Sequence, residues 1–428
     1  MPFIPSEKNS GKQRDRKPQE RPAGARHQPR PLRLTHAKTL SENLGTPLFR
    51  PLSAELRAFL ERLPELLDQV MPLRGAHRKD LPDAVLELSS LLTAERSGLA
   101  LPYWSSPRLT SAYLRYFLPW NLIRLGRFLP SLPLPVPPSG ALVLDLGSGP
   151  LTLPLALWLA LPAWRETPLE VLAVDASIQP MELGRRLFSL VAPNSPWRIR
   201  TLRAPLHKAL YEAHGTPFLI TAGNVLNELA EHKDRHGEAS QAERLAEMAG
   251  RMSARLAENG AILCVEPGTR LGGTVLEQLR AGAVEARLQP VSPCPHDGEC
   301  PLLERRGAGS GWCHALMDND GASSWLRQLT EAAHLGKSSL SLAHMLLRRV
   351  DEKEERAAES VSQARVLSDS FAVPGLGLAR YACTGQGLVL LAASAGAAQG
   401  ALVRIRPSRP PRKDAKTGAA VMVIAEGS

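Results

Sequence analysis

Three cysteines lie close together in the second half of the chain, each beside residues that favour turns. Cys294 and Cys300 belong to the sequence Cys-Pro-His-Asp-Gly-Glu-Cys-Pro, and Cys313 belongs to Gly-Trp-Cys-His. A packed core has no use for thiols placed among Pro, Gly, His and Asp, whereas zinc or an iron–sulfur cluster requires thiolates gathered on turns. The pattern predicts a metal site, to which we expect Cys383 to add the fourth thiolate.

Two kinds of metal centre fit these donors. His296 and His314 could complete a mixed zinc site with the three neighbouring cysteines, so the residues alone favour zinc and an iron–sulfur cluster equally. The compact Cys-x3-Cys-x2-Cys set of a radical enzyme is absent from the sequence. Cys264 stands among apolar residues of a predicted strand, and we expect it in the core.

Glycines and polar residues follow several predicted strands. They are Asp145, Gly147, Ser148, Gly149, Asp175, Asn224 and Glu266. Open α/β sheets bind ligands beyond the carboxyl ends of their strands, so these residues should converge, with Asp145 orienting the glycine loop. A Gly-x-Gly after a strand often marks only a turn, but Asp175 at the end of the next strand could bind two ribose hydroxyls. The set predicts a nucleoside ligand.

The glycine turn discriminates between two such ligands. A dinucleotide site needs Gly-x-Gly-x-x-Gly to admit a pyrophosphate, and the turn Asp145-Leu-Gly-Ser-Gly-Pro-Leu-Thr152 lacks the last glycine. The turn resembles the first motif of class I methyltransferases, with Asp175 matching their ribose-binding acid, so S-adenosylmethionine is the expected cofactor. The third glycine common in that motif is Leu151 here, which we expect to narrow the loop.

Alternating strands and helices would position these residues. Predicted strands cover 141–146, 170–175, 217–224 and 260–266. The alternation predicts an α/β fold with a doubly wound, Rossmann-like, mostly parallel sheet covered by helices. Helical spacing of apolar residues before it predicts an N-terminal helical region, and we expect the aromatic rings of Tyr113, Tyr116 and Trp120 to pack rather than stack on bases.

Composition and charge divide the chain further. The expected parts are a disordered basic arm (1–40), a helical region and linker (41–138), a methyltransferase-like core (139–290), a cysteine-rich insertion with the last core strand (291–350), a small β module carrying Cys383 (351–400) and a basic C-terminal tail (401–428). The net charge of +10 gathers at both ends, which favours a polyanion such as RNA as partner, although solubilising tails are also basic.

Hydropathy and the first residues bear on location. No run of about eighteen apolar residues could span a membrane, and Met-Pro-Phe-Ile-Pro-Ser-Glu does not look like a secretory signal. Five cysteines without such a signal fit a reducing compartment, so we expect a cytoplasmic protein. We also expect a monomer.

Several further motifs occur in one order. They are Asp145-Leu-Gly-Ser-Gly-Pro, Asn224-Val-Leu-Asn-Glu-Leu, Val265-Glu-Pro-Gly-Thr, Cys294-Pro-His with Cys300-Pro, Trp312-Cys-His and Lys337-Ser-Ser-Leu-Ser-Leu. Over roughly 141–391 the chain resembles the methyltransferase-like assembly factors of the small ribosomal subunit, known from mitochondria and with bacterial relatives. The resemblance implies a class I methyltransferase fold, a 4Fe-4S cluster held by Cys294, Cys300, Cys313 and Cys383, and the small subunit with its rRNA as partners.

The enzymatic step is less defined by the sequence. Asn224, Asn227 and Glu228 follow the fourth strand, where class I enzymes often contact their substrate, and they are the candidate catalytic residues of an rRNA methyltransferase. Asn227 and Glu228 are equally suited to cap the next helix, and the Asn-Pro-Pro-Tyr string of many base methyltransferases is absent. The alternative is a non-catalytic RNA-binding assembly factor, or a redox or iron sensor of small-subunit assembly.

Overall fold

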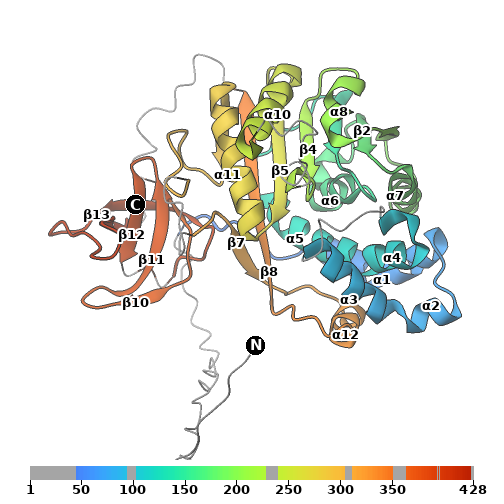
Figure 1. The fold of residues 1–428 in the computed structure, drawn as a ribbon, viewed down its shortest axis with the longest axis horizontal. Helices are drawn as coiled ribbons and strands as arrows, with labels where there is room; N and C mark the ends of the chain where they lie inside the picture. Colours follow the sequence, from blue (N-terminus) through green and yellow to red (C-terminus); the bar gives the residue numbers. More distant parts are fainter. Residues whose placement is uncertain are drawn as a thin grey trace, which may run out of the picture. The chain divides into compact units, whose positions relative to one another are not determined.

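The computed structural model of the chain is drawn in Figure 1. It describes residues 45–93, 103–227, 240–303, 311–349, 363–392, 394 and 396–425. All of them belong to one unit, Glu42–Ser428. The predicted basic arm 1–40 and the candidate residue Glu228 lie outside the described residues. Within the described ranges, no helix combines the length and the apolar character that a membrane span needs.

The larger sheet has eight strands in the order β3-β2-β1-β4-β5-β8-β6, with β7 pairing to β8. The strands are β1 (Ala141–Leu146), β2 (Leu169–Asp175), β3 (Arg198–Arg203), β4 (Leu219–Gly223), β5 (Ala261–Pro267), β6 (Leu288–Ser292), β7 (Ala315–Asp318) and β8 (Ser339–Arg349). Strands β1 to β5 run parallel, and β8 runs antiparallel to β5, β6 and β7. This is a mixed α/β fold whose main sheet has a parallel part covered by helices, as predicted.

Helices cover both faces of this sheet because its parallel strands are apolar on both sides. One apolar core joins the sheet to α1 (Ala54–Val70), α5 (Leu118–Phe128), α6 (Thr152–Ala160) and α7 (Ile178–Val191). The other joins it to α8 (Leu206–Glu212), α10 (Gln241–Arg255) and α11 (Arg270–Glu285). Cys264 is fully buried in the second core, which confirms its predicted place.

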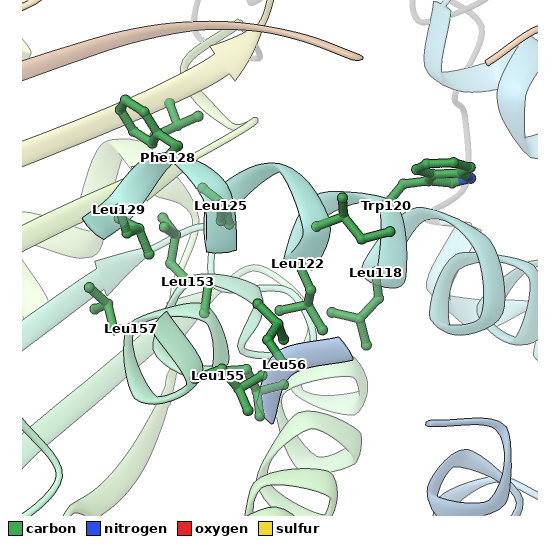
Figure 2. Close-up of a cluster of buried hydrophobic side chains, with 14 of the residues drawn as sticks. Leu56, Leu118, Trp120, Leu122, Leu125, Phe128, Leu129, Leu153, Leu155 and Leu157 are labelled. Atoms are coloured by element: carbon green, nitrogen blue, oxygen red, sulfur yellow. The ribbon is translucent and has the colours of Figure 1, made fainter. Parts of the chain in front are cut away.

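Helix α5 packs closely on α6 and α1. Figure 2 shows Leu122 of α5 near Leu56 of α1 and Leu155 of α6, and Leu125 of α5 near Leu153 of α6. The approach to α1 is so close that a Cβ on Gly126 would lie 2.1 Å from Leu56 Cδ2. Further helices in this part of the chain are α2 (Gly75–Lys79), α3 (Leu81–Thr93) and α4 (Pro107–Ala112), and α12 (Ser324–Ala332) lies later in the chain.

A π-helical turn, Tyr113–Phe117, joins α4 to α5. Such single turns are frequent at functional sites. Tyr116 and Trp120 are 1% and 2% exposed, which confirms that these two rings pack in the core. Tyr113 is only half-buried and lies at a pocket described below.

The C-terminal sheet is a second, closed sheet, drawn in orange to red in Figure 1. Its strands are β9 (Gln363–Val366), β10 (Phe371–Val373), β11 (Gly377–Thr384), β12 (Gly387–Ala392), β13 (Leu402–Pro407) and β14 (Ala420–Ile424). Their order is β10-β11-β12-β14-β13-β9, and β9 closes the ring by pairing with β11 as well as β13.

The predicted tail 401–428 is therefore wrong for most of its length, because β13 and β14 are strands of the closed sheet. Val403 and Ile405 point into the core of this sheet, while Arg404 and Arg406, which alternate with them, are exposed. An alternation of this kind is typical of a half-buried strand. Because the arginines are exposed, the composition of this segment resembles that of a solvated tail.

Candidate functional site

A pocket opens where β1 and β4 end, and we call it the strand-end pocket. Its cavity volume is ≈ 30 Å³, and the empty space around it, open solvent included, is ≈ 430 Å³. It is lined by Tyr113, Asn121, Arg124, Leu125, Asp145, Gly147, Ser148, Thr152, Leu153, Gly223, Asn224 and Val265. Four of the six residues predicted to bind the cofactor, Asp145, Gly147, Ser148 and Asn224, are thus brought together.

The glycine loop depends on backbone conformations that side chains rarely adopt. Gly147 has φ +65°, and a Cβ there would lie 2.4 Å from Val225 Cγ2. Leu151 also has a positive φ of 57°, at the position where the methyltransferase motif commonly has glycine. Its side chain is fully buried against Ala173 and Met181 and does not line the strand-end pocket. The expected narrowing of the loop by Leu151 is therefore not found.

Asp145 fixes the glycine loop through a hydrogen bond with Ser148. Its carboxylate accepts hydrogen bonds from the hydroxyl of Ser148 and from Thr221 Oγ1 on β4, the latter at 2.6 Å. Burial raises the pKa of Asp145 to about 7, against the lowering effect of these two hydrogen bonds. Both carboxylate oxygens are engaged within the protein, so Asp145 shapes the site more than it offers a free base.

Asp175 lies at the end of β2, on the other side of the glycine loop. The N–H of Gly149 donates to its Oδ2 and the N–H of Ser177 donates to its Oδ1, both at 2.9 Å. Burial raises its pKa, and the backbone hydrogen bonds act in the opposite direction. Asp175 and Gly149 do not line the strand-end pocket, so the predicted ribose site adjoins the pocket rather than forming its wall.

The segment after β4 places Asn224 in the pocket and Asn227 outside it. Asn224 has φ +57°, and within the described part of the chain its buried Oδ1 has no hydrogen-bond partner. Glu266 is fully buried, and its Oε1 accepts from the N–H groups of Val225 and Leu226 at 3.0 and 2.8 Å. Asn227 is 2% exposed and does not line the pocket. Glu266 therefore supports this segment from behind.

Arg124 at the pocket and Lys337 near Arg124 are two cations that were not predicted from the sequence. Arg124 lines the pocket, and burial lowers its pKa to about 10. Burial, and then the charge of Arg124, lowers the pKa of Lys337 to about 8. No carboxylate among the described residues pairs with either side chain. An anionic group in the pocket would supply the missing charge. The available signal was the set of three polar residues, Asn121, Arg124 and Arg127, in an otherwise apolar helix.

The four cysteines of the predicted metal site also converge, and we call them the cysteine cluster. Burial raises the pKa of Cys313 well above its usual value, and the nearby thiols of Cys294, Cys300 and Cys383 raise it further. Cys383 comes from β11 of the C-terminal sheet, and its Sγ lies 3.2 Å from His296 Nε2. All five cysteines lie within the described ranges and have free thiols.

The donors of the cysteine cluster do not close on one point. Among the described residues, no group of three His, Cys, Asp or Glu side chains has the spacing to hold a single metal ion. The ring of His314 turns away, with its Nδ1 3.0 Å from the carbonyl oxygen of Trp312 and the two rings stacked. The mixed zinc site with His314 is not formed.

Two buried arginines flank the cysteine cluster. Arg280 is 3% exposed, and its Nε donates to Cys294 Sγ at 3.2 Å. Arg365 is 8% exposed and donates through Nε to the carbonyl of Pro293 at 2.7 Å. In the described part of the chain neither arginine has an ion pair with a carboxylate. The buried carboxylate of Glu277 also lies beside the thiols, where its Oε1 accepts from the N–H of Cys313 at 2.8 Å. The two buried arginines suit a negatively charged centre, which Glu277 supplies in part.

Comparison with known proteins matched one family model and a number of solved structures. The family model described as "Mitochondrial small ribosomal subunit Rsm22" matches residues 112–365. No curated protein matches the chain. Solved structures similar to it include a methyltransferase from Pyrococcus furiosus, at 13% identity over 50% of this chain and 77% of that one, with a TM-score of 0.28. An arsenic(III) S-adenosylmethionine methyltransferase from Chlamydomonas reinhardtii has 15% identity over 56% and 76%, with a TM-score of 0.30.

Proposed function

The chain belongs to the mitochondrial small ribosomal subunit Rsm22 family, whose model matches residues 112–365, and from this premise we propose that it is an S-adenosylmethionine-dependent methyltransferase of small-subunit rRNA that carries a 4Fe-4S cluster. The observation that carries the enzymatic part is the strand-end pocket, where the glycine loop, Asn224 and Arg124 face one cavity. The association with the small ribosomal subunit rests on the family.

The residues present fit the methyl donor. The donor's methionyl part carries an ammonium and a carboxylate, and the pocket offers a buried acceptor, Asn224 Oδ1, and an unpaired cation, Arg124, to match them. Gly147 lets the glycine loop pack closely on the segment after β4, since any side chain there would collide with Val225. Asp175 beside Gly149 is suited to the ribose hydroxyls, because a carboxylate accepts more hydrogen bonds than the two it has.

The donor supplies an activated methyl group that an acceptor atom takes by in-line displacement. Positioning supplies most of the rate in such a step, and no strong base is required. Tyr113 and Asn121 stand on the wall of the pocket that the helical region contributes, where an acceptor base would be oriented. Asp145 keeps the loop in place through Ser148 and Thr221.

The cluster part of the proposal is supported by the cysteine cluster and its charges. A cubane centre is larger than one ion, so its thiolates need not meet at a single point. Four thiolates around iron and sulfide carry net negative charge, which would compensate Arg280 and Arg365 beyond what Glu277 supplies. Zinc is the alternative metal, with His296 rather than His314 as its nitrogen ligand.

One observation favours the non-catalytic alternative, in which the protein binds rRNA and senses iron or redox state. Asn227 is buried away from the pocket, and both oxygens of Asp145 are occupied, so within the described residues the pocket holds no free acid or base. Methyl transfer to a ring nitrogen does not need one, which is why we prefer the enzyme.

The test is incubation of anaerobically purified protein with immature small subunits and donor labelled in its methyl group. We expect label in rRNA with the native protein and none with Asp175→Ala. Glu258→Ala, a change at an exposed acid with no contact to the site, is the control and should retain labelling. Binding of subunits without any label in rRNA would contradict the enzyme and leave the assembly factor.

A further inference from the structure

The pairing of the C-terminal strands defines a known kind of barrel. Five strands close the barrel. In it β9 pairs with β11, β11 with β12, β12 with β14, β14 with β13, and β13 with β9. In chain order these strands are the first to the fifth, so the order around the barrel is 1-2-3-5-4 and back to 1. Every pair is antiparallel except β12 with β14. This is the strand order of the OB-fold, with β10 as a hairpin extension of the second strand.

We propose that this barrel binds single-stranded RNA, across the outer face of β11 and the loop between β13 and β14. In OB-folds the face of the second and third strands, with the loops beside it, takes oligonucleotides. The choice of RNA over other single strands rests on the proposed function. The barrel interior is filled by its own apolar core, and the Cys383 end of the outer face of β11 is buried in the cysteine cluster, so the part of that face left for a ligand is the hairpin end around Tyr381.

The loop between β13 and β14 carries charge that suits phosphates. Its basic side chains, all exposed, are Arg409, Arg412, Lys413 and Lys416. Arg404 and Arg406 on β13 are exposed as well. The described barrel residues between 363 and 425 contain eight Lys or Arg and two Asp. Backbone phosphates of a nucleic acid supply most of the affinity for such a surface.

Hydrogen bonds attach the loop between β13 and β14 to the hairpin β10–β11. Asp414, its only acid, accepts from the Tyr381 hydroxyl at 3.0 Å and from the N–H of Thr417, also at 3.0 Å. The guanidinium of Arg412 donates to the carbonyl of Gly375 in the hairpin turn at 3.3 Å. Figure 1 shows the hairpin and the loop projecting from the same side of the barrel. The cations therefore border the face of β11.

Two aromatic rings lie on that face. Phe371 and Tyr381 are half-buried, with centroids 5.1 Å apart, and they pack on an outer apolar cluster around Leu390 and Val421. Leu378 beside them is 47% exposed. Aromatic platforms bordered by cations bind single strands, because every unpaired base has a face that stacks, whereas a duplex keeps its bases inside.

The test uses full-length, metal-loaded protein and a fluorescent single-stranded RNA of about 12 nucleotides, within the site size of one OB-fold. The triple variant Arg409→Glu, Lys413→Glu, Lys416→Glu should weaken binding at least about tenfold and reduce the slope of log affinity against log salt by about 2. Phe371→Leu, which keeps the apolar packing, should weaken binding roughly fivefold or more.

The matched control is Arg62→Glu, Arg74→Glu, Lys79→Glu, which makes the same charge change at exposed residues in and near α1 and α2. It should affect RNA affinity less than the barrel variant does. Crosslinks from the bound RNA should fall within residues 367–384 and 408–418. Equal losses from both triple variants, equal affinity for a duplex, or crosslinks confined to residues 1–44 would overturn the proposal.

Failure of this proposal is distinguishable from failure of the proposed function. Binding of S-adenosylhomocysteine to the same preparations reports on the strand-end pocket alone. The barrel variants should leave that affinity unchanged, and Asp175→Ala should lose it while keeping RNA affinity. Loss of RNA binding in Asp175→Ala would contradict a separate RNA surface on the barrel.

Discussion

The strand-end pocket and the cysteine cluster are both assembled from distant residues, but by different means. The pocket lies at the ends of β1, β4 and β5, whose strand-end residues are brought together by ordinary strand pairing in one parallel sheet, and helices that pack on this sheet complete its wall. The cysteine cluster joins Cys383 of the C-terminal barrel to loops beside the larger sheet, with His296 3.2 Å away as the bridging contact. The pocket is a product of the fold, whereas the cysteine cluster helps to hold two sheets together.

The two sites also satisfy their charges differently. The carboxylates of Asp145 and Asp175 are bonded within the protein, and the pocket's unpaired charge is Arg124. The cysteine cluster instead has Arg280 and Arg365 buried beside thiols. A site of the first kind should survive the loss of its ligand, and a site of the second kind should not, because the proposed metal centre would couple binding to folding there.

Removal of one cysteine ligand should have the largest effect. Cys383→Ser should abolish bound iron and sulfide and lower the free energy of unfolding by several kcal/mol, since binding at structural metal sites is worth on the order of 10 kcal/mol. Metal analysis and thermal unfolding of anaerobically purified protein measure both. The control is Cys264→Ala, a change at a core thiol outside the cysteine cluster, and this variant should keep its iron. If Cys383→Ser also kept its iron, the barrel would contribute no ligand to the metal site.

A change of pH should alter the stability that Asp145 contributes at the strand-end pocket. The pKa of Asp145 is raised to about 7, so between pH 4 and 7 the folded state binds a proton that the unfolded state has lost. Stability from this group should therefore fall as pH rises through that window, by on the order of a few kcal/mol. Unfolding of Asp145→Asn should lack this dependence. Parallel pH profiles of the two proteins would show that Asp145 is ionised throughout.

A side chain in the glycine loop should remove the donor without unfolding the protein. Gly147→Val combines a positive φ with a clash against Val225, and a strain of about 1–3 kcal/mol corresponds to roughly a 5- to 150-fold loss of S-adenosylhomocysteine affinity. Gly250→Ala is the control, because nothing lies within 4 Å of its added Cβ. Iron content should be unchanged in both, so a loss of iron from Gly147→Val would show that the two sites are coupled.

Neutralising Arg124 should give the smallest change, with opposite signs in two measurements. Arg124→Met should stabilise the ligand-free protein by up to about 1 kcal/mol, because a buried cation without a carboxylate is costly. It should weaken donor binding by about tenfold, since a charge-assisted hydrogen bond is worth roughly 1.5–3 kcal/mol. A variant that is less stable and binds normally would assign Arg124 to the fold alone.

The parts of the fold that could be predicted are those whose signal is local. The strand Ala141–Leu146 was predicted with its observed bounds, because an unbroken apolar run followed by a glycine turn has few other solutions. The buried place of Cys264 and the packing of Tyr116 follow from their apolar neighbours in the same way. Motifs located the pocket residues at the strand ends for the same local reason.

What the sequence alone determined, then, is the order of strands and helices, the glycine loop and the set of cysteines. Tertiary structure decided that Arg124 lines the strand-end pocket with Lys337 near it, that Leu151 packs inward, and that the residues from Leu402 to Ile424 close a barrel instead of forming a tail. The physical reason is the distance along the chain over which each interaction acts. Apolar periodicity and turn preferences act over a few neighbouring residues, whereas ring closure and the meeting of two cations depend on strands that are distant in the chain.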